Sequence, residues 1–310
     1  MLKQLLYSIL SVLLGAVFIF SAYTKLYPVE PFELTFVDLG IASWRVAPFM
    51  ARFLIGLEFF TGALLLFNLN IKFAGKLTIF LLSVFIVYLL ALIAFTGNKG
   101  NCGCFGNYIV MTPLQGIIKN IILLLFTFLL LKNYDGPDYK KITKPLFYFL
   151  ILFSFALPHI LNYVDLNYSQ AYLNSPEDHF KLELDSLYKD AKLNVPPKDL
   201  SKGKRIIAFM SLSCPHCRIA ASKIRIMQER NPAIPIYFVL NGEDEKLAPF
   251  FEETKSNKIP HCMLLGRNFV FLAGTNMPSI YLVNNSVVES RIDYMSLDQT
   301  EIEKWLGLKN

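Results

Sequence analysis

Charged side chains are scarce in this sequence: Asp, Glu, Lys and Arg make up 17% of its 310 residues, whereas 54% of the residues are hydrophobic. The apolar residues gather in the first half, which excludes a single soluble domain and predicts a membrane part. The net charge of +6 comes largely from lysines that flank the apolar segments and from ordinary surface lysines. We therefore expect no nucleic-acid partner.

Metal ligands are also scarce, with five cysteines and four histidines in the whole chain. A structural zinc site takes about four ligands. Cys214 and Cys217 have the spacing of half a zinc site, but the only nearby candidates to complete it are His261 and Cys262. We expect no bound metal, and zinc stays as an alternative to the redox interpretation.

The cysteines of the tetrad Cys214-Pro215-His216-Cys217 are predicted to form a redox pair. The tetrad follows a β-branched apolar stretch at 205–210 and opens a helix-like run at 218–230. This strand, turn and helix context is typical of a redox C-x-x-C motif, with a structural disulfide as the alternative. Because a helix N-terminus stabilises a thiolate, Cys214 is the predicted nucleophile, supported by the imidazole of His216. Cys217, one turn further on, is the predicted resolving thiol.

Five apolar runs have about the length of a membrane span, which takes about 20 residues. They cover approximately 5–23, 48–67, 77–95, 114–131 and 145–160. The first run is expected to be a retained helix and not a cleaved signal peptide, because its apolar part is long and residues 20–22 make a poor cleavage site. After Tyr163 the apolar density falls to that of a soluble protein.

Lysines in the short connections favour a cytoplasmic N-terminus, because such residues resist translocation. On that side the connections hold Lys3, Lys72, Lys76, Lys132, Lys140, Lys141 and Lys144, and on the other side they hold Lys25, Arg45 and Lys99. Five crossings then put everything after Tyr163 outside the cytoplasm, where disulfide chemistry is at home. We expect the inner membrane of a bacterium, with the C-terminal part in the periplasm.

A second cysteine pair, Cys102 and Cys104, follows the third apolar run and falls on the same predicted outer side. Two cysteines separated by one glycine can close only a tight, strained ring, for which Gly103 supplies backbone freedom. Strained disulfides are easily reduced, which makes them good exchange partners. We predict that Cys102 and Cys104 relay electrons. A pair of reduced loop thiols and a fragment of a metal site are the alternatives.

Three ionisable residues fall inside the apolar runs, where they are costly: Arg52, Glu58 and Lys119. All three are candidate functional residues of the membrane part. Arg52 and Lys119 lie near helix ends and are expected to extend towards the membrane surface. Glu58 lies deeper, and we expect it to form an interhelical hydrogen bond or ion pair, with a proton-relay or quinone-site role as the alternative.

Four groups of residues in the first part of the chain form a recognisable pattern: residues 21–26 followed by Pro31-Phe32, residues 51–58 followed by Gly62, the loop 102–106, and Lys119-Asn120. In these residues the chain resembles the DoxX-like membrane proteins, most closely the MauE (methylamine utilisation) branch. It implies a four-helix membrane bundle linked to the redox maturation of periplasmic proteins. The bundle is also similar, more loosely, to those of DsbB and the vitamin K epoxide reductases, where a quinone accepts electrons from cysteines. A quinone is the cofactor that this resemblance implies.

From about Ser201 to the end, the chain is similar to thioredoxin-like domains. The Cys-Pro-His-Cys tetrad resembles that of DsbA-type oxidases, and Met277-Pro278 before an apolar stretch at 279–283 resembles the cis-proline loop that faces the active site in that fold. A cis bond there implies that Pro278 orients an incoming peptide along a short β-pairing edge. An ordinary trans turn is the alternative.

The sequence thus predicts an α-helical membrane bundle of four spans plus a fifth tethering span, followed by an α/β thioredoxin-like domain. The expected parts are a four-helix domain at 1–131, a cytoplasmic loop and fifth span at 132–164, an extracytoplasmic linker with a short helix at 165–200, and the thioredoxin-like domain at 201–310. The predicted function is a membrane-bound thiol–disulfide oxidoreductase that exchanges electrons between extracytoplasmic protein cysteines and a membrane redox carrier. A non-catalytic maturation factor or chaperone is the alternative. Cys262 is expected to be a buried free thiol.

Overall fold

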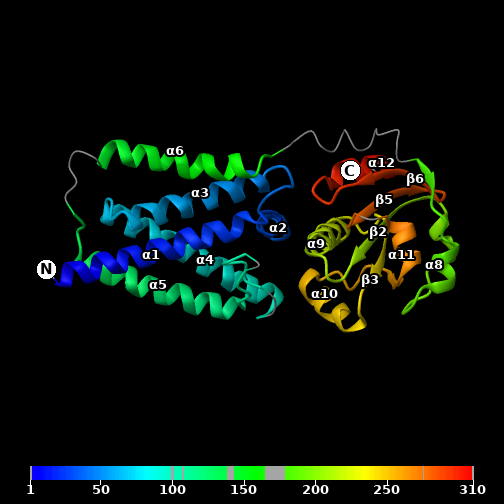
Figure 1. Cartoon of the computed structure of the whole chain (residues 1–310), viewed down its shortest axis with the longest axis horizontal. Helices are drawn as coiled ribbons and strands as arrows, with labels where there is room; N and C mark the ends of the chain where they lie inside the picture. Colours follow the sequence, from blue (N-terminus) through cyan, green and yellow to red (C-terminus); the bar gives the residue numbers. More distant parts are fainter. Residues whose placement is uncertain are drawn as a thin grey trace. The chain divides into compact units, whose positions relative to one another are not determined.

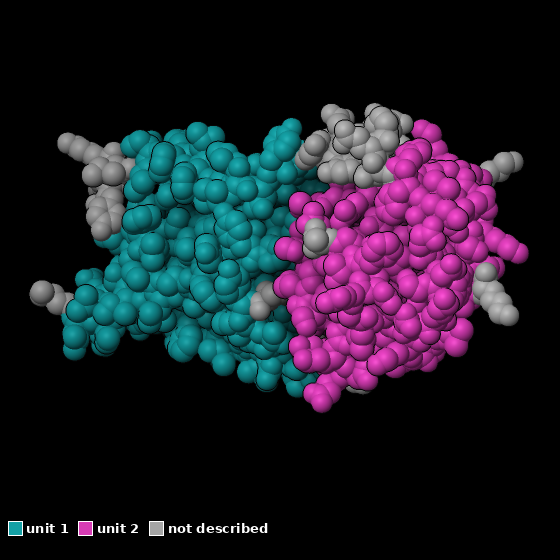
Figure 2. Space-filling view, turned by 45° about the vertical axis from the view of Figure 1, so that its right-hand side comes forward, with its two compact units in different colours: residues 1–164 teal, residues 165–310 magenta. Residues whose placement is uncertain are grey.

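The computed structural model describes residues 2–98, 101–106, 108–137, 143–164, 179–274 and 276–308. The chain divides into two compact units, residues 1–164 and residues 165–310, which Figure 2 shows in different colours. In its described residues the first unit is built from helices, and the second combines a sheet with helices.

Long apolar helices make up the first unit (Figure 1). Among the described residues, five helices are long and apolar enough to cross a membrane, which confirms the five predicted spans. They are α1 (Leu2–Leu26), α3 (Ala47–Leu66), α4 (Ile71–Thr96), α5 (Pro113–Asn133) and α6 (Thr143–Leu161).

Helix α3 packs against both α1 and α6, and α4 and α5 form the other close pair. Helices α1 and α3 approach each other at two glycines: a Cβ on Gly15 would lie 2.7 Å from the carbonyl oxygen of Gly62. Small residues allow helix backbones to come this close, and van der Waals contact is a main source of helix association within lipid.

A short helix that the sequence does not predict, α2 (Glu30–Asp38), follows α1. Its Glu33 accepts a hydrogen bond of 2.5 Å from the guanidinium of Arg52, a residue that is 4% exposed. Arg52 Nε also donates to the carbonyl oxygen of Asn162, just beyond α6. Arg52 is therefore buried, with Glu33 and backbone carbonyls as its partners.

In its described residues, the second unit is a six-stranded sheet with helices on both faces (Figure 1). The strands are β1 (Phe180–Lys181), β2 (Lys204–Ser211), β3 (Ile236–Asn241), β4 (His261–Met263), β5 (Ser279–Asn284) and β6 (Val287–Ile292), in the spatial order β1-β6-β5-β2-β3-β4. Strand β3 is parallel to β2 and β4, whereas the pairs β2–β5, β5–β6 and β6–β1 are antiparallel. The helices are α8 (Asp185–Asp190), α9 (Pro215–Arg230), α10 (Leu247–Thr254), α11 (Arg267–Ala273) and α12 (Gln299–Leu306), with 3-10 turns η2 (Lys198–Ser201) and η3 (Asp244–Lys246).

Strand β2 is central, and side chains on both of its faces are buried. Ile207 and Phe209 share one core cluster with Leu187 of α8 and Phe269 of α11. Because side chains alternate along a strand, the residues between them face the other side of the sheet. Burial on both faces explains why β2 is a continuous apolar run in the sequence and not an alternating one.

The folded part of the second unit begins before the predicted boundary at 201. Residues 165–178 of the expected linker lie outside the described residues. From Phe180 onward, however, the chain belongs to the sheet and its core: β1 pairs with β6, and Lys192 forms a bridge with Met263. The core takes in Leu182, Leu184, Leu187 and Leu200. The predicted start of the domain at residue 201 is therefore too late. The spaced leucines bury the preceding segment in the core, although it contains several prolines.

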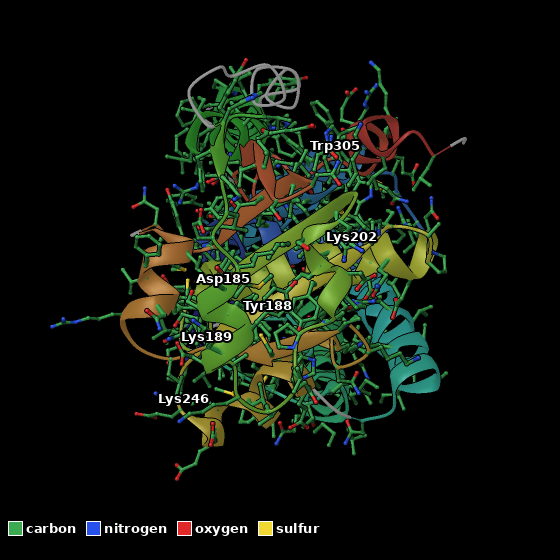
Figure 3. The ribbon with its side chains drawn as sticks, turned by 90° about the vertical axis from the view of Figure 1, so that its right-hand side faces the viewer. Asp185, Tyr188, Lys189, Lys202, Lys246 and Trp305 are labelled. Atoms are coloured by element: carbon green, nitrogen blue, oxygen red, sulfur yellow. The ribbon has the colours of Figure 1, made fainter. Side chains whose placement is uncertain are left out.

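Helix α8 lies within this segment and carries the short helix that the sequence predicts there. Asp185, Tyr188 and Lys189 come from this helix, as Figure 3 shows. The ring of Tyr188 packs against the core, and its hydroxyl donates to the carbonyl oxygen of Pro197 over 3.3 Å. This contact ties α8 to the chain that leads into η2 and β2.

Four of the strands lie in the order β3-β2-β5-β6. Helix α9 joins the parallel strands β2 and β3, and α12 follows the β5–β6 hairpin. This is the arrangement of thioredoxin-like domains. The predicted fold class, a helical membrane bundle followed by an α/β thioredoxin-like domain, is confirmed.

Candidate functional site

The C-x-x-C tetrad lies at the start of α9. Cys214 is the N-cap residue with an extended backbone (φ −83°, ψ 121°), and its sulfur accepts a hydrogen bond of 3.4 Å from the backbone N–H of Cys217. Pro215 occupies the first turn, where its missing N–H leaves no helical hydrogen bond unmade. The half-buried sulfur of Cys214 therefore faces the positive end of the helix dipole. The predicted position of the tetrad between strand and helix is confirmed.

Cys217 lies one turn further along α9 and is fully buried. Its sulfur accepts a hydrogen bond of 3.4 Å from the backbone N–H of Ser211, the last residue of β2. Burial, together with the contact to Cys214, raises the pKa of the Cys217 thiol. Cys217 is thus buried and protonated, whereas the sulfur of Cys214 is more accessible. This difference suits Cys214 to act as a nucleophile and Cys217 as a resolving thiol.

The Met277–Pro278 bond is cis, as predicted. The carbonyl oxygen of Met277 lies 4.0 Å from the sulfur of Cys214, so this loop lies against the tetrad. Strand β5 starts at the next residue, Ser279, whose hydroxyl donates to the carbonyl oxygen of Ala273. The backbone before Pro278 is thereby held beside the cysteine, where an extended peptide could pair with it.

His216 is exposed and stacks on Tyr294, with ring centroids 5.1 Å apart and ring planes 25° apart. Tyr294 belongs to the loop between β6 and α12. The buried ammonium of Lys223, on α9, donates to the carbonyl oxygens of Tyr294 (3.0 Å) and Met295 (3.4 Å), which ties this loop to the active-site helix. Sequence analysis missed Tyr294 and Lys223, because no local pattern links them to the tetrad.

In the first unit, Cys102 and Cys104 lie as free thiols in the loop between α4 and α5. Asn101 organises this loop: its side chain accepts from the N–H of Gly103 (3.1 Å) and donates to the carbonyl oxygen of Gly106 (2.8 Å). Both glycines have positive φ, 70° and 54°, a conformation that a side chain disfavours. The glycines around the cysteines are thus required by the turn.

Both sulfurs lie against helix α5 at Gly116. A Cβ on this glycine would lie 3.2 Å from the Cys104 sulfur and 3.3 Å from the Cys102 sulfur. A hydrogen bond from the Cys102 thiol, helped by the positive charges of Lys119 and Lys25, lowers the pKa of Cys104 to about 6. The same pairing, with burial, raises the pKa of the Cys102 thiol. Cys104 is therefore the more reactive sulfur of the pair near neutral pH.

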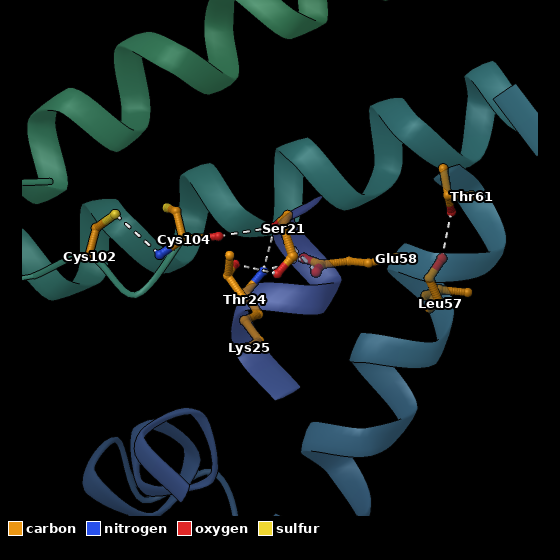
Figure 4. Close-up of polar contacts among 8 residues, drawn as sticks. All are labelled: Ser21, Thr24, Lys25, Leu57, Glu58, Thr61, Cys102 and Cys104. Atoms are coloured by element: carbon orange, nitrogen blue, oxygen red, sulfur yellow. Dashed lines mark hydrogen bonds and ion pairs between the residues drawn. The ribbon is translucent and has the colours of Figure 1, made fainter. Parts of the chain in front are cut away.

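Beside this loop, Lys25 and Glu58 form a buried ion pair with a Nζ–Oε1 distance of 2.6 Å (Figure 4). Ser21 connects the pair to the cysteine loop: its hydroxyl accepts from Lys25 Nζ over 2.8 Å and donates to the Cys104 carbonyl oxygen over 3.0 Å. The interhelical ion pair expected for Glu58 is thus present. The sequence assigns Lys25 to an outer loop, which is wrong, because Lys25 occupies the last turn of α1. The i, i+4 spacing of Ser21 and Lys25 is the sequence feature that could have placed Lys25 on the same helix face as Ser21.

A cavity of about 140 Å³ lies between the cysteine loop and the helices around it. Its walls are mostly apolar, and Cys102, Cys104 and Lys119 line it as well. The Nζ of Lys119 lies 4.3 Å from the ring centroid of Phe105. The two loop cysteines therefore line the same cavity as Glu58 and Lys119, two of the three ionisable residues that the sequence places in the spans. The third, Arg52, does not line it.

Known proteins match both parts of the chain. Residues 3–133 match the family described as methylamine utilisation protein MauE, which confirms that resemblance. Protein TlpB of Flavobacterium psychrophilum is 31% identical, over 78% of this chain and 78% of that protein. The chain belongs to the TlpB family. This TlpB-family protein joins a MauE membrane domain to a thioredoxin-like domain.

Two solved structures also resemble part of this TlpB-family chain. The thioredoxin domain of a thiol-disulfide oxidoreductase from Bacteroides vulgatus is 20% identical, over 38% of this chain and 90% of that one, with a TM-score of 0.29. A secreted disulfide oxidoreductase of Mycobacterium tuberculosis is 14% identical, over 34% and 81%, with a TM-score of 0.28. The topology of the second unit and the cysteines at the start of α9 make the TlpB-family protein a thiol–disulfide oxidoreductase-like membrane protein.

The fifth cysteine of this TlpB-family chain, Cys262, lies on β4 and is fully buried, so the predicted buried free thiol is confirmed. Burial raises the pKa of the Cys262 thiol to about 11, although a hydrogen bond with the Tyr237 hydroxyl acts in the opposite direction. A thiol held protonated in the core is unsuited to disulfide exchange. Within the described residues, no three His, Cys, Asp or Glu side chains are grouped to hold a metal ion.

Proposed function

We propose that this protein is a membrane-bound thiol–disulfide oxidoreductase. Cys214 exchanges with cysteines of extracytoplasmic proteins, Cys217 resolves the mixed disulfide, and Pro278 orients the partner. Cys102 and Cys104 pass electrons between this site and a redox carrier in the membrane.

One observation carries the proposal: the chain leaves the bundle at the end where the cysteine loop lies. Asn162, just after α6, donates to the carbonyl oxygen of Leu26 over 3.4 Å. The loop meets the same end of α1, since a Cβ on Gly106 would lie 2.2 Å from the carbonyl oxygen of Thr24. The stretch between α6 and β1 contains no apolar run that could cross the membrane again. Both cysteine pairs would therefore share one aqueous compartment.

The compartment that fits this chemistry is the periplasm, with the bundle in the bacterial inner membrane. The lysine bias of the connections supports this orientation, and disulfide exchange persists in such oxidising compartments. The short connection between the two units would keep the cysteine pairs at about millimolar effective concentration, which makes exchange between them efficient.

The decisive experiment traps the exchange between the two pairs. Without its resolving thiol, a Cys217→Ser chain should accumulate an intramolecular mixed disulfide between Cys214 and Cys104 or Cys102, visible by non-reducing peptide mass spectrometry. Cys262→Ser in the same background is the matched control, because this buried cysteine should not contribute. Repeated failure to trap the bond would mean that the bundle is only an anchor.

A second measurement tests whether the protein is an enzyme at all. The purified chain should reduce or oxidise a model disulfide, and Cys214→Ser should abolish that activity together with the biological effect. An inactive chain whose biological effect survives Cys214→Ser would instead be a non-catalytic maturation factor or chaperone. Tags that place residues after 164 in the cytosol would rule out the relay.

A further inference from the structure

An arginine on a neighbouring strand holds the loop that carries Pro278. Arg291, on β6, lies opposite Tyr281 of β5, and its guanidinium carbon is 5.9 Å from the centre of the tyrosine ring. Its Nη2 donates to the carbonyl oxygen of Asn276 and to the hydroxyl oxygen of Ser279, each over 3.0 Å. Arg291 therefore bonds the chain on both sides of Pro278.

The donors and acceptors around this guanidinium are matched. Its Nη2 carries two hydrogens and can serve both acceptors at once. The Ser279 hydroxyl has one hydrogen, and the carbonyl oxygens of Ala273 and Asn276 lie 2.5 and 2.7 Å from its oxygen. It can donate to only one of them at a time. Because Arg291 supplies a donor to Asn276, the hydroxyl can donate to Ala273, and both carbonyls are satisfied.

The bond to Asn276 fixes the direction of the next backbone amide. The carbonyl of Asn276 and the N–H of Met277 belong to one trans peptide unit, in which the two groups point in opposite directions. Since the carbonyl is turned towards Arg291, the N–H of Met277 is turned away from it. Within the described residues this N–H has no acceptor, and the carbonyl oxygen of the same residue lies 4.0 Å from the Cys214 sulfur. Met277 thus presents an unpaired donor beside the reactive cysteine.

We propose that Arg291 is a positioning residue for partner recognition, which aims the Met277 N–H at a backbone carbonyl next to the partner's cysteine. Main-chain pairing of this kind takes an extended segment and does not depend on the partner's side chains at that point. The partner class is therefore a cysteine in an unfolded or extended stretch of protein. A donor that is fixed in advance costs less to bind than one that must first be ordered. The inference rests on the proposed exchange at Cys214.

Two disulfide probes test this role in the full reduced chain in detergent. One is an unstructured peptide with an internal disulfide, and the other is hydroxyethyl disulfide, which has no peptide backbone. Two electrons and two protons pass from Cys214 and Cys217 to the probe, so their disulfide forms while the probe separates into thiols, which mass spectrometry follows. The rate in Cys214→Ser is subtracted as background. Arg291→Met should raise the half-saturating peptide concentration about tenfold, as expected for one lost hydrogen bond, at an unchanged maximal rate. The rate with hydroxyethyl disulfide should not change.

The matched control is Arg205→Met. Arg205, on β2, also donates two guanidinium N–H groups to a backbone carbonyl, that of Lys202, but it lies at the opposite end of the strand from the tetrad. Its substitution should leave both reactions unchanged. Arg291→Lys, which keeps the charge and a donor, should recover part of the affinity for the peptide.

An unchanged half-saturating peptide concentration in Arg291→Met would overturn the positioning role. Equal slowing of both probes would also overturn it, because Arg291 would then only stabilise the site as a whole. These results are distinct from failure of the proposed function. A natural chain that exchanges with neither probe contradicts the exchange at Cys214 and this inference with it. A natural chain that reduces both probes, with an Arg291→Met variant that does so equally well, contradicts only the role of Arg291.

Discussion

Gly116 of α5 leaves room for the sulfur of Cys104: a Cβ on this glycine would lie 3.2 Å from Sγ. We expect Gly116→Ala to displace the cysteine loop, because the added methyl group also meets the Cys102 sulfur at 3.3 Å. Overpacking of this kind costs about 1–3 kcal/mol. Thermal unfolding in detergent should show the loss, and alkylation of the reduced chain should show altered reactivity at Cys104.

The matched control for this substitution is Ile118→Ala, on the same helix at a half-exposed position. It should leave the alkylation of Cys104 unchanged, since the side chain lies away from the sulfurs. If Gly116→Ala and Ile118→Ala alter the reaction of Cys104 equally, the close approach of Gly116 has no effect on the cysteine pair.

The reactivity of Cys104 should depend on pH in a characteristic way. Its pKa is lowered to about 6 by the Cys102 thiol and by Lys119 and Lys25, so the thiolate should persist down to about pH 6. Alkylation of the reduced chain by iodoacetamide should rise through pH 6 and level off above about pH 7, whereas an ordinary cysteine titrates near about 8.5. Peptide mass spectrometry can follow the rate at Cys104 alone.

Two substitutions separate the causes of this low pKa. Cys102→Ala removes the thiol donor, which is the largest cause, and should move the midpoint of Cys104 alkylation to higher pH. Lys119→Met removes one positive charge and should move it in the same direction by less. A midpoint that stays near pH 6 in both variants would contradict the hydrogen bond between the two cysteines.

The ion pair of Lys25 and Glu58 should be needed as a pair. Both side chains are at most 3% exposed, so Lys25→Met leaves an uncompensated carboxylate inside the bundle. Breaking a buried pair in this way costs about 3–5 kcal/mol, whereas replacing both partners by apolar residues is often nearly neutral. Thermal unfolding of Lys25→Met, Glu58→Met and the double variant should show the double variant to be more stable than either single one. A double variant as unstable as the sum of the two would mean that the charges act independently.

The parts of this molecule that could be predicted from the sequence are those that local patterns determine. Apolar length alone places the five spans, and the C-x-x-C motif between an apolar stretch and a helical run places Cys214 at a helix start. The cis bond before Pro278 follows from the resemblance to thioredoxin-like domains. In each case, neighbouring residues or a short motif carry the information.

The contacts between distant segments could not be predicted in this way. Lys25 meets Glu58, and Gly116 meets Cys104, only because particular faces of different helices are turned towards one another. Arg52 is buried because α2, which has no strong apolar pattern, brings Glu33 to it. A single sequence shows which residues a span contains but not which neighbour each of its faces meets.

The stacked pair of His216 and Tyr294 gives a prediction for the soluble unit. An imidazole held at the start of α9 should stabilise the thiolate of Cys214, which stabilises the reduced state and makes the disulfide a better oxidant. Tyr294→Ala releases the imidazole from its position, 5.1 Å from the tyrosine ring, and should therefore lower the reduction potential of the pair. We expect a fall of about 10–30 mV, where about 30 mV is a tenfold change in the equilibrium.

The potential can be measured by equilibrating the full chain with glutathione buffers and quantifying the Cys214–Cys217 disulfide by alkylation and mass spectrometry. Tyr294→Phe keeps the ring and is the control that should leave the potential unchanged. Lys223→Met should act in the same direction as Tyr294→Ala, because it removes the ammonium that holds the Tyr294 carbonyl oxygen at 3.0 Å. A potential that rises in Tyr294→Ala, or that shifts equally in Tyr294→Phe, would show that stacking on the ring does not position His216 for this role.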